Sequence, residues 1–296
     1  MIRRKAFISS IITMFVVFAP SIGCATQPQS SNGATRASQP RPIPRRVILQ
    51  PFTESILGTT VSFDMVPVNK PNPNPDSKYR LKQSPFWIAK TEVTWDLYDL
   101  FTYGLDRTGT EGDPEVDAVT RPSKPYISMD RGFGRSGYPV ISVSYHGART
   151  FCQWLSEKTG KNYRLPTESQ WKIVCESAGG KTLTNPAQHA WYEENADYQT
   201  HEVATKKANG LGLHDMFGNA SEWCSTIDGK GVTMGGTYQD TADAIGCLAR
   251  VEPIEEWNEL DPQIPKGIWW LTDAGFVGLR VVCIPSVDED EGANDD

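Results

Sequence analysis

Residues that interrupt regular secondary structure occur along most of the chain, which contains 25 glycines and 21 prolines among 296 residues. Between them lie 9 tryptophans, 10 tyrosines and 11 phenylalanines, whose large side chains favour burial. This pattern excludes a long coiled coil and a collagen repeat. It predicts a soluble fold rich in loops, in which aromatic side chains hold the loops to a core.

The negative charge of the chain is concentrated at its C-terminus. The formal net charge is −7, and six of the acidic side chains are Asp288, Glu289, Asp290, Glu291, Asp295 and Asp296. The rest of the sequence is nearly neutral and has no basic stripe that could neutralise phosphates. We therefore expect no nucleic-acid partner, and we interpret residues 286–296 as an acidic, disordered tail.

The N-terminus has the pattern of an export signal. Basic residues at positions 3–5 precede an apolar run from Ala6 to Val17, and small residues follow up to Cys24. The run is shorter than the ~20 residues that a membrane span needs, and Pro20 ends it. Residues 22–24 resemble a bacterial lipobox, which implies a lipid on Cys24; ordinary cleavage nearby is the alternative. We predict a signal peptide over residues 1–24 and location at the cell envelope.

The segment that follows differs in composition from the rest. Residues 25–47 consist mostly of Ser, Gln, Thr, Pro, Gly and Arg. Because such a segment buries too little apolar surface to offset its ordering entropy, we predict a flexible linker. The ordered domain is expected over residues 48–285.

Local signals in this domain predict short helices and short strands. Phe86–Ala89 has the composition of a strand, and Tyr145–Thr159 has a helical apolar face followed by Gly160 at the C-terminal cap. Thr167 precedes Gln170 by three residues, which is the spacing of a capping box that opens a helix over residues 171–177. Few helices, short strands and long loops together predict an α+β fold.

Seven short motifs follow one another through the domain. They are Phe86-Trp87-Ile88 with Lys90-Thr91-Glu92-Val93-Thr94, Pro139-Val140 with Val143-Ser144-Tyr145, Phe151-Cys152-Gln153-Trp154-Leu155, Tyr163-Arg164-Leu165-Pro166-Thr167-Glu168 with Trp171, Gly212-Leu213-His214-Asp215-Met216-Phe217-Gly218-Asn219 with Glu222-Trp223, Gly235-Gly236-Thr237, and Phe276-Val277-Gly278-Leu279-Arg280. In this order they resemble the formylglycine-generating enzyme or sulfatase-modifying factor domain. The resemblance implies a single large α+β domain with a C-type-lectin-like variant of the fold, and it is strongest to exported bacterial members.

The resemblance also implies where catalysis would lie. The copper-dependent oxidases of this family bind Cu(I) through two cysteines after a Gly-Gly-Ser segment, and soft thiolates select Cu(I). Here Asp240 stands at the first of these positions, and no residue before Cys247 corresponds to the second. We therefore expect no copper and assign no catalytic residue.

Histidine ligands and oxygen ligands would form two other kinds of metal site. The histidines are not spaced as a ligand set and are interpreted as surface or structural residues: His146, His189, His201 and His214. The resemblance implies a structural calcium ion, held by the side chains of Asp215 and Glu222 and by the carbonyls of Gly218 and Ala220. Such hard oxygen ligands suit Ca²⁺, and a hydrogen-bonded loop without metal is the alternative.

The cysteine count indicates an oxidising compartment. Apart from Cys24 there are five cysteines, an odd number that predicts two disulfides and one thiol. By resemblance, Cys175 pairs with Cys247, and Cys152 pairs with a residue of the last strand. Cys283 lies two residues beyond the family's position on that strand, on the same face. Cys224 is then the remaining, buried thiol.

Two functions are compatible with these observations. The first is a non-catalytic binding or scaffold module of the cell envelope, with a peptide, a glycan or an envelope protein as partner. The alternative is a formylglycine-generating-type oxidase or related metalloenzyme acting on protein or thiol substrates. Asp240 and the missing second cysteine favour the first. Trp257 and residues 269–273 are expected to belong to the core or to line a lectin-like groove.

Overall fold

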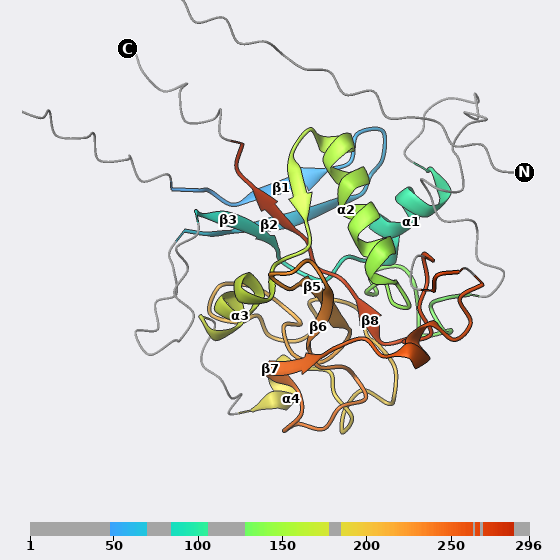
Figure 1. The fold of residues 1–296 in the computed structure, drawn as a ribbon. Coiled ribbons are helices and arrows are strands. Elements are labelled where there is room, and N and C mark those ends of the chain that lie inside the picture. Colours follow the sequence, from blue (N-terminus) through green and yellow to red (C-terminus); the bar gives the residue numbers. More distant parts are fainter. Residues whose placement is uncertain are drawn as a thin grey trace, which may run out of the picture. The chain divides into compact units, whose positions relative to one another are not determined.

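The computed structural model describes residues 48–69, 84–105, 128–177, 185–262, 264–266 and 269–286 (Figure 1). All of these belong to one unit of the chain, residues 46–296. The predicted signal peptide and linker, and the acidic tail beyond Ser286, lie outside the described residues.

Two β-sheets organise this unit. The first has the strand order β1-β2-β3-β9-β4 with antiparallel neighbours throughout, and the second has the order β7-β6-β5-β8, in which β5 and β8 run parallel. The strands are β1 (Phe52–Ser55), β2 (Ser62–Val68), β3 (Phe86–Ala89), β4 (Asn162–Arg164), β5 (Ser221–Ser225), β6 (Gly231–Gly235), β7 (Gly246–Val251), β8 (Val277–Gly278) and β9 (Val282–Ile284). The predicted strand over residues 86–89 is confirmed.

The described residues form four α-helices and one 3₁₀ turn. They are α1 (Trp95–Tyr103), α2 (Tyr145–Thr159), α3 (Glu168–Glu176), α4 (Pro186–His189) and the 3₁₀ turn η1 (Glu255–Asn258). Helix α2 is capped by the side chain of Ser144, which accepts a hydrogen bond from the Gly147 amide, and it ends at Gly160 with φ 69°. Within the described ranges, no helix combines the length and apolar character that a membrane-spanning segment requires.

Helix α3 starts earlier than the sequence analysis predicted. The capping box of Thr167 and Gln170 is formed as expected. However, the helix begins at Glu168 rather than at Trp171, because the residue that follows an N-cap is already the first helical residue. The capping pattern therefore located the helix correctly, and only its first turn was missed.

The first sheet separates two hydrophobic clusters. Along the last strand, Val281 and Cys283 face the cluster that includes α1 and α2, whereas Val282 faces the cluster that includes α3. This alternation is the period-two pattern of a strand that is buried on both faces. Cys283 therefore lies on the same face as Val281, as expected.

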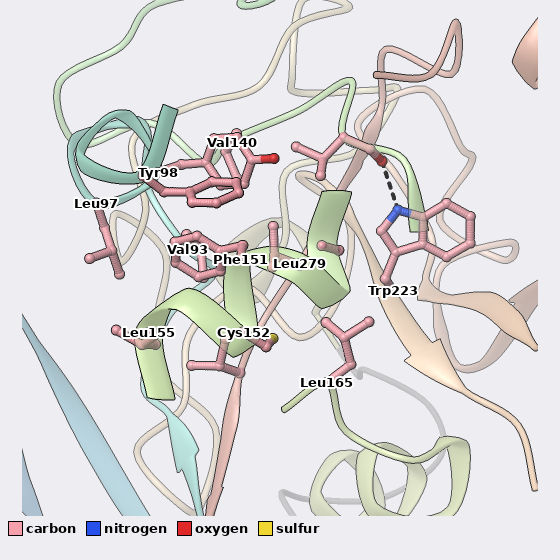
Figure 2. Close-up of a cluster of buried hydrophobic side chains, with 14 of the residues drawn as sticks. Val93, Leu97, Tyr98, Val140, Phe151, Cys152, Leu155, Leu165, Trp223 and Leu279 are labelled. Carbon is pink, nitrogen blue, oxygen red and sulfur yellow. Dashed lines mark hydrogen bonds between the residues drawn. The ribbon is translucent and has the colours of Figure 1, made fainter. Parts of the chain in front are cut away.

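Aromatic side chains join α1 to α2. The Tyr98 and Phe151 rings stack with centroids 5.2 Å apart, and the Phe101 and Trp154 rings lie 5.7 Å apart. In the same cluster, the Trp223 indole donates a hydrogen bond of 2.7 Å to the Val143 carbonyl (Figure 2). Buried aromatic pairs of this kind stabilise a core beyond their area of burial, so a loop-rich chain can still pack tightly here.

The five-stranded sheet curls until its outer strands meet. Glu54 lies on β1 at one edge and Tyr163 on β4 at the other edge. Even so, the Tyr163 hydroxyl donates a hydrogen bond of 2.5 Å to Glu54, and the Lys161 ammonium lies 2.9 Å from the same carboxylate. Because neighbouring strands are about 4.8 Å apart, a flat sheet would keep these residues far from each other. The contact therefore requires strong curvature.

Candidate functional site

The loop after β6 occupies the place where the resemblance puts copper. Gly235 and Gly236 have φ values of 101° and 80°, a backbone conformation that glycine adopts without strain. The Asp240 carboxylate then accepts hydrogen bonds from the Thr237 amide (2.7 Å) and the Thr237 hydroxyl (2.9 Å). Asp240 thus fixes the turn of its own loop.

The cysteine that follows this loop is part of a disulfide bond. Cys247, which is seven residues after Asp240 in the sequence, is bonded to Cys175 of α3, which confirms that predicted pair. Cys224 is a buried thiol, and burial raises its pKa well above the usual value, so it resists becoming a thiolate. Among the described residues, no pair of thiolates is therefore available at Asp240, and the loop does not fit Cu(I).

The second predicted disulfide is not formed. Cys152 and Cys283 are buried in the same hydrophobic cluster, but the structure does not join them. The family position would be Val281, and a shift of two residues along a strand moves the side chain by about 6.6 Å. Because a disulfide requires a narrow range of Cα and Cβ separations, sharing a strand face is not sufficient. The prediction of Cys152–Cys283 is wrong in this structure.

Glu222, predicted to bind calcium, is instead paired with a buried guanidinium. Arg280 donates hydrogen bonds to both carboxylate oxygens of Glu222, with distances of 2.6–3.0 Å, and the side chains of this pair are 0% and 1% exposed. The Trp171 indole donates a further bond of 2.6 Å to Glu222. The carboxylate is therefore already satisfied by protein donors.

A second buried carboxylate supports the neighbouring loop, and the sequence analysis gave it no role. Glu92 accepts hydrogen bonds of 2.9 Å from the Ala220 amide and from the Asn219 side chain. Its burial, with Asp215 and Glu222 nearby, raises its pKa well above the ordinary value. Glu92 stands within a recognised motif, but nothing in its local sequence indicates a partner that lies more than a hundred residues away.

Asp215, the other predicted calcium ligand, has an unused oxygen. One carboxylate oxygen accepts a hydrogen bond of 2.7 Å from the Ala204 amide, whereas Oδ1 is buried and has no hydrogen-bond partner. Burial raises the pKa of Asp215. Leaving a buried acceptor unsatisfied is costly, so Asp215 is suited to bind a cation. Glu222 could bind one only after losing its contacts with Arg280.

The two backbone positions of the predicted calcium site are tightly constrained. A Cβ atom on Gly218 would lie 2.0 Å from the Trp191 carbonyl oxygen, so only glycine fits there. The Ala220 amide is held by Glu92, as described above. Among the described residues, no group of three or more His, Cys, Asp or Glu side chains is spaced to hold a metal ion.

The histidines and tryptophans singled out in the sequence make structural contacts. Each ring has a neighbour: His146 packs on Trp270, His201 stacks on Trp191, and one ring nitrogen of His189 and of His214 lies within hydrogen-bond distance of the carbonyls of Lys207 and Lys206, respectively. Trp257 and Trp270 are buried core residues, only 7% and 5% exposed. Neither of them lines the two hollows described next.

The surface groove lies elsewhere. A groove of about 850 Å³ runs between α3, the β5–β6 hairpin and the end of β7, lined by polar residues that include Tyr145, Glu168 and Arg250. A second hollow of about 690 Å³ lies over α2 and β4. Thr167 and Ser225 line both, so the two hollows are adjacent. No signal in the sequence predicted this groove, because its walls come from four separated segments.

Two solved structures share the fold of this chain. Treponema denticola variable protein 1 superposes with a TM-score of 0.57 at 21% sequence identity, covering 80% of this chain and 100% of that protein. PvdO from Pseudomonas aeruginosa gives a TM-score of 0.52 at 19% identity, covering 77% of this chain and 97% of its own. The protein is a single α+β domain with the C-type-lectin-like variant of the formylglycine-generating enzyme fold, as predicted.

The chain belongs to the family of the sulfatase-modifying factor enzyme 1-like domain, whose model matches residues 44–259. The chaperone protein LppX of Paenibacillus barcinonensis is 29% identical over 211 residues, which are 56% of this chain and 72% of that protein. The formylglycine-generating enzyme of Mycobacterium tuberculosis is 31% identical over 109 residues, which cover 31% of this chain and 34% of the enzyme.

A further relative is the serine/threonine-protein kinase pkn1 of Chlamydia caviae, 32% identical over 133 residues. The match covers 42% of this chain but only 20% of the kinase. The chain thus spans about a fifth of the length of this relative, and the similarity establishes the shared domain alone.

Proposed function

We propose that this protein is a non-catalytic binding module of the bacterial cell envelope. The observation that carries the proposal is the state of the loop after β6, where Asp240 caps its own turn and Cys247 is bonded to Cys175. A carboxylate is a hard ligand and a disulfide sulfur carries no thiolate, so neither suits Cu(I). A groove bordered by polar side chains is then the feature best suited to a partner.

Export and lipid anchoring are part of the proposal. They rest on the basic start, the apolar run and Cys24 of the sequence. The relation to LppX, named a chaperone, is compatible with a binding role. Metabolic labelling with a fatty acid tests the anchor, because a chain with Cys24→Ser should take up no label; equal labelling of both chains would contradict it.

The absence of oxidase activity is directly testable. We expect no aldehyde when the purified protein is incubated with Cu(I), oxygen and a peptide that carries a sulfatase cysteine motif, because the loop holds no thiolate pair. The aldehyde is trapped with a hydrazide and detected by mass spectrometry. The formylglycine-generating enzyme of Mycobacterium tuberculosis serves as the positive control, and aldehyde above a metal-free sample of this protein would overturn the proposal.

A structural calcium ion at Asp215 is also proposed, with the Gly218 and Ala220 carbonyls as further ligands and Glu222 remaining with Arg280. The unsatisfied Asp215 Oδ1 supports it. We expect calcium at about 100 times its Kd to stabilise the folded state by about 2.7 kcal/mol, measured as a higher melting temperature. The shift should disappear in Asp215→Asn, and an equal shift in that variant would contradict the assignment.

A further inference from the structure

The hollow over α2 and β4 contains an excess of positive charge. Its charged lining consists of Arg149, Arg164 and Glu157, and His146 lies beside them. Glu157 is an exposed residue that accepts a weak hydrogen bond of 3.3 Å from Gln153. In the described part of the chain, neither guanidinium forms a salt bridge with a carboxylate.

Arg164 is unusual among the arginines that are withdrawn from solvent. It is half-buried, and its Nη1 donates to two neutral oxygens, those of the Leu165 carbonyl (2.9 Å) and the Gln170 amide (2.8 Å). Burial lowers the pKa of Arg164. By contrast, the buried Arg280 and the half-buried Arg135 each contact carboxylates. A cation removed from water is costly unless it is paired. Among the described residues, Arg164 has no carboxylate partner, whereas the other two arginines do.

Arg149 lines the same hollow as Arg164. Cys152 lines this hollow as well; burial raises the pKa of its thiol, and the positive charges of Arg164 and Arg149 act in the opposite direction. Their positions on β4 and on the outer face of α2 place them on two walls of one hollow.

We infer that this hollow is an oxyanion subsite, in which Arg149 and Arg164 bind a carboxylate or phosphate group. A guanidinium presents N–H donors in a planar fork that matches such groups with two parallel bonds. Thr150 and Gln153, which line the same hollow, supply additional polar atoms. The bound anion would give the half-buried Arg164 a counter-charge, which none of the described carboxylates provides.

The hollow is too large for a single ion. Its volume is about 690 Å³, and it adjoins the groove of about 850 Å³ at Thr167 and Ser225. That groove contains charges of both signs, which are already paired with each other, as in Arg250 with Glu168 and Glu252. The subsite therefore fits one end of a larger ligand, whose anionic group is held by the two arginines and whose polar remainder follows the groove.

The test uses two oxyanion probes at constant ionic strength. Inorganic phosphate and citrate are each titrated into the isotope-labelled protein, and the backbone resonances of Thr150 and Gln153 are followed by NMR. We expect saturable shifts with at least one probe and none with glucose. Phosphate alone would indicate a phosphate-bearing ligand, citrate alone a carboxylate-bearing one, and both support the shared chemistry.

Substitutions separate this subsite from general surface charge. Arg149 is exposed, so Arg149→Gln should fold normally, and we expect it to weaken binding at least about tenfold, as loss of a charge-assisted hydrogen bond does. Lys90→Gln, which removes an equal charge on another surface, should leave the affinity unchanged. Absence of saturable shifts in the wild type, or equal affinity in Arg149→Gln, would overturn the inference. These binding results are independent of whether the oxidase assay detects aldehyde, so the two proposals can fail separately.

Discussion

Replacing Arg280 with methionine is expected to lower the free energy of unfolding by about 3–5 kcal/mol, which is the usual cost of removing one partner from a buried ion pair. The reason is that Glu222 would keep its burial and lose the guanidinium that contacts both of its oxygens. The positive charge of Arg280 also favours the ionised forms of Glu92 and Asp215. These two carboxylates would lose that stabilisation as well. Urea unfolding followed by circular dichroism measures the effect.

An exposed ion pair provides the matched control. Lys90 and Asp64 form a salt bridge with side chains that are 41% and 48% exposed. We expect Lys90→Met to cost less than about 1 kcal/mol, as surface pairs usually do. The double variant Arg280→Met with Glu222→Gln should recover part of the loss, since it no longer leaves a carboxylate without its partner. A loss below about 1 kcal/mol in Arg280→Met alone would show that the pair contributes little.

Removing the disulfide between Cys175 and Cys247 is expected to cost about 4 kcal/mol in the chain-entropy view of cross-links. The two cysteines are 72 residues apart, so the bond closes a long loop and restricts the unfolded chain strongly. The bond also fixes α3 to β7, two elements that border the groove. The variant with both cysteines replaced by alanine should therefore melt at a clearly lower temperature.

Reduction of the wild type distinguishes cross-linking from packing. A reducing agent should bring the melting temperature of the wild type close to that of the double variant and should leave the double variant unchanged. Cys224→Ala, which shortens a buried thiol that is in no disulfide, should cost less than the double variant and should not alter the response to reductant. An equal response of wild type and double variant would mean that the cross-link is not stabilising.

The sequence predicted those features that depend on residues close together in the chain. The end of α2 at Gly160 and the capping box at Thr167 are each determined within four residues, and both are present. The family resemblance supplied the pairing of Cys175 with Cys247, which is also present. Short-range sequence patterns and the family resemblance were therefore sufficient to predict these helix ends and this disulfide.

Partner choice across the fold could not be predicted in the same way. Judged from its own segment, Glu222 is a plausible calcium ligand. In the folded protein it is instead paired with Arg280, 58 residues later. Glu92 contacts Ala220, 128 residues away, and no pattern marks that pair in advance. The side chains of the groove also come from separated segments, so its existence depends on the tertiary arrangement. The partners of these charged side chains are determined by the tertiary structure and not by their neighbours in the sequence.

The contact between Glu54 and Tyr163 has a mechanical consequence for a protein held by its N-terminus. A tether ahead of residue 48 would transmit any pull directly to β1, the outermost strand of its sheet. An outermost strand on its own could be peeled away one residue pair at a time. Because Glu54 is bonded to Tyr163 on the far strand and to Lys161 just before that strand, tension would instead be shared across the sheet, and the domain would yield as a whole.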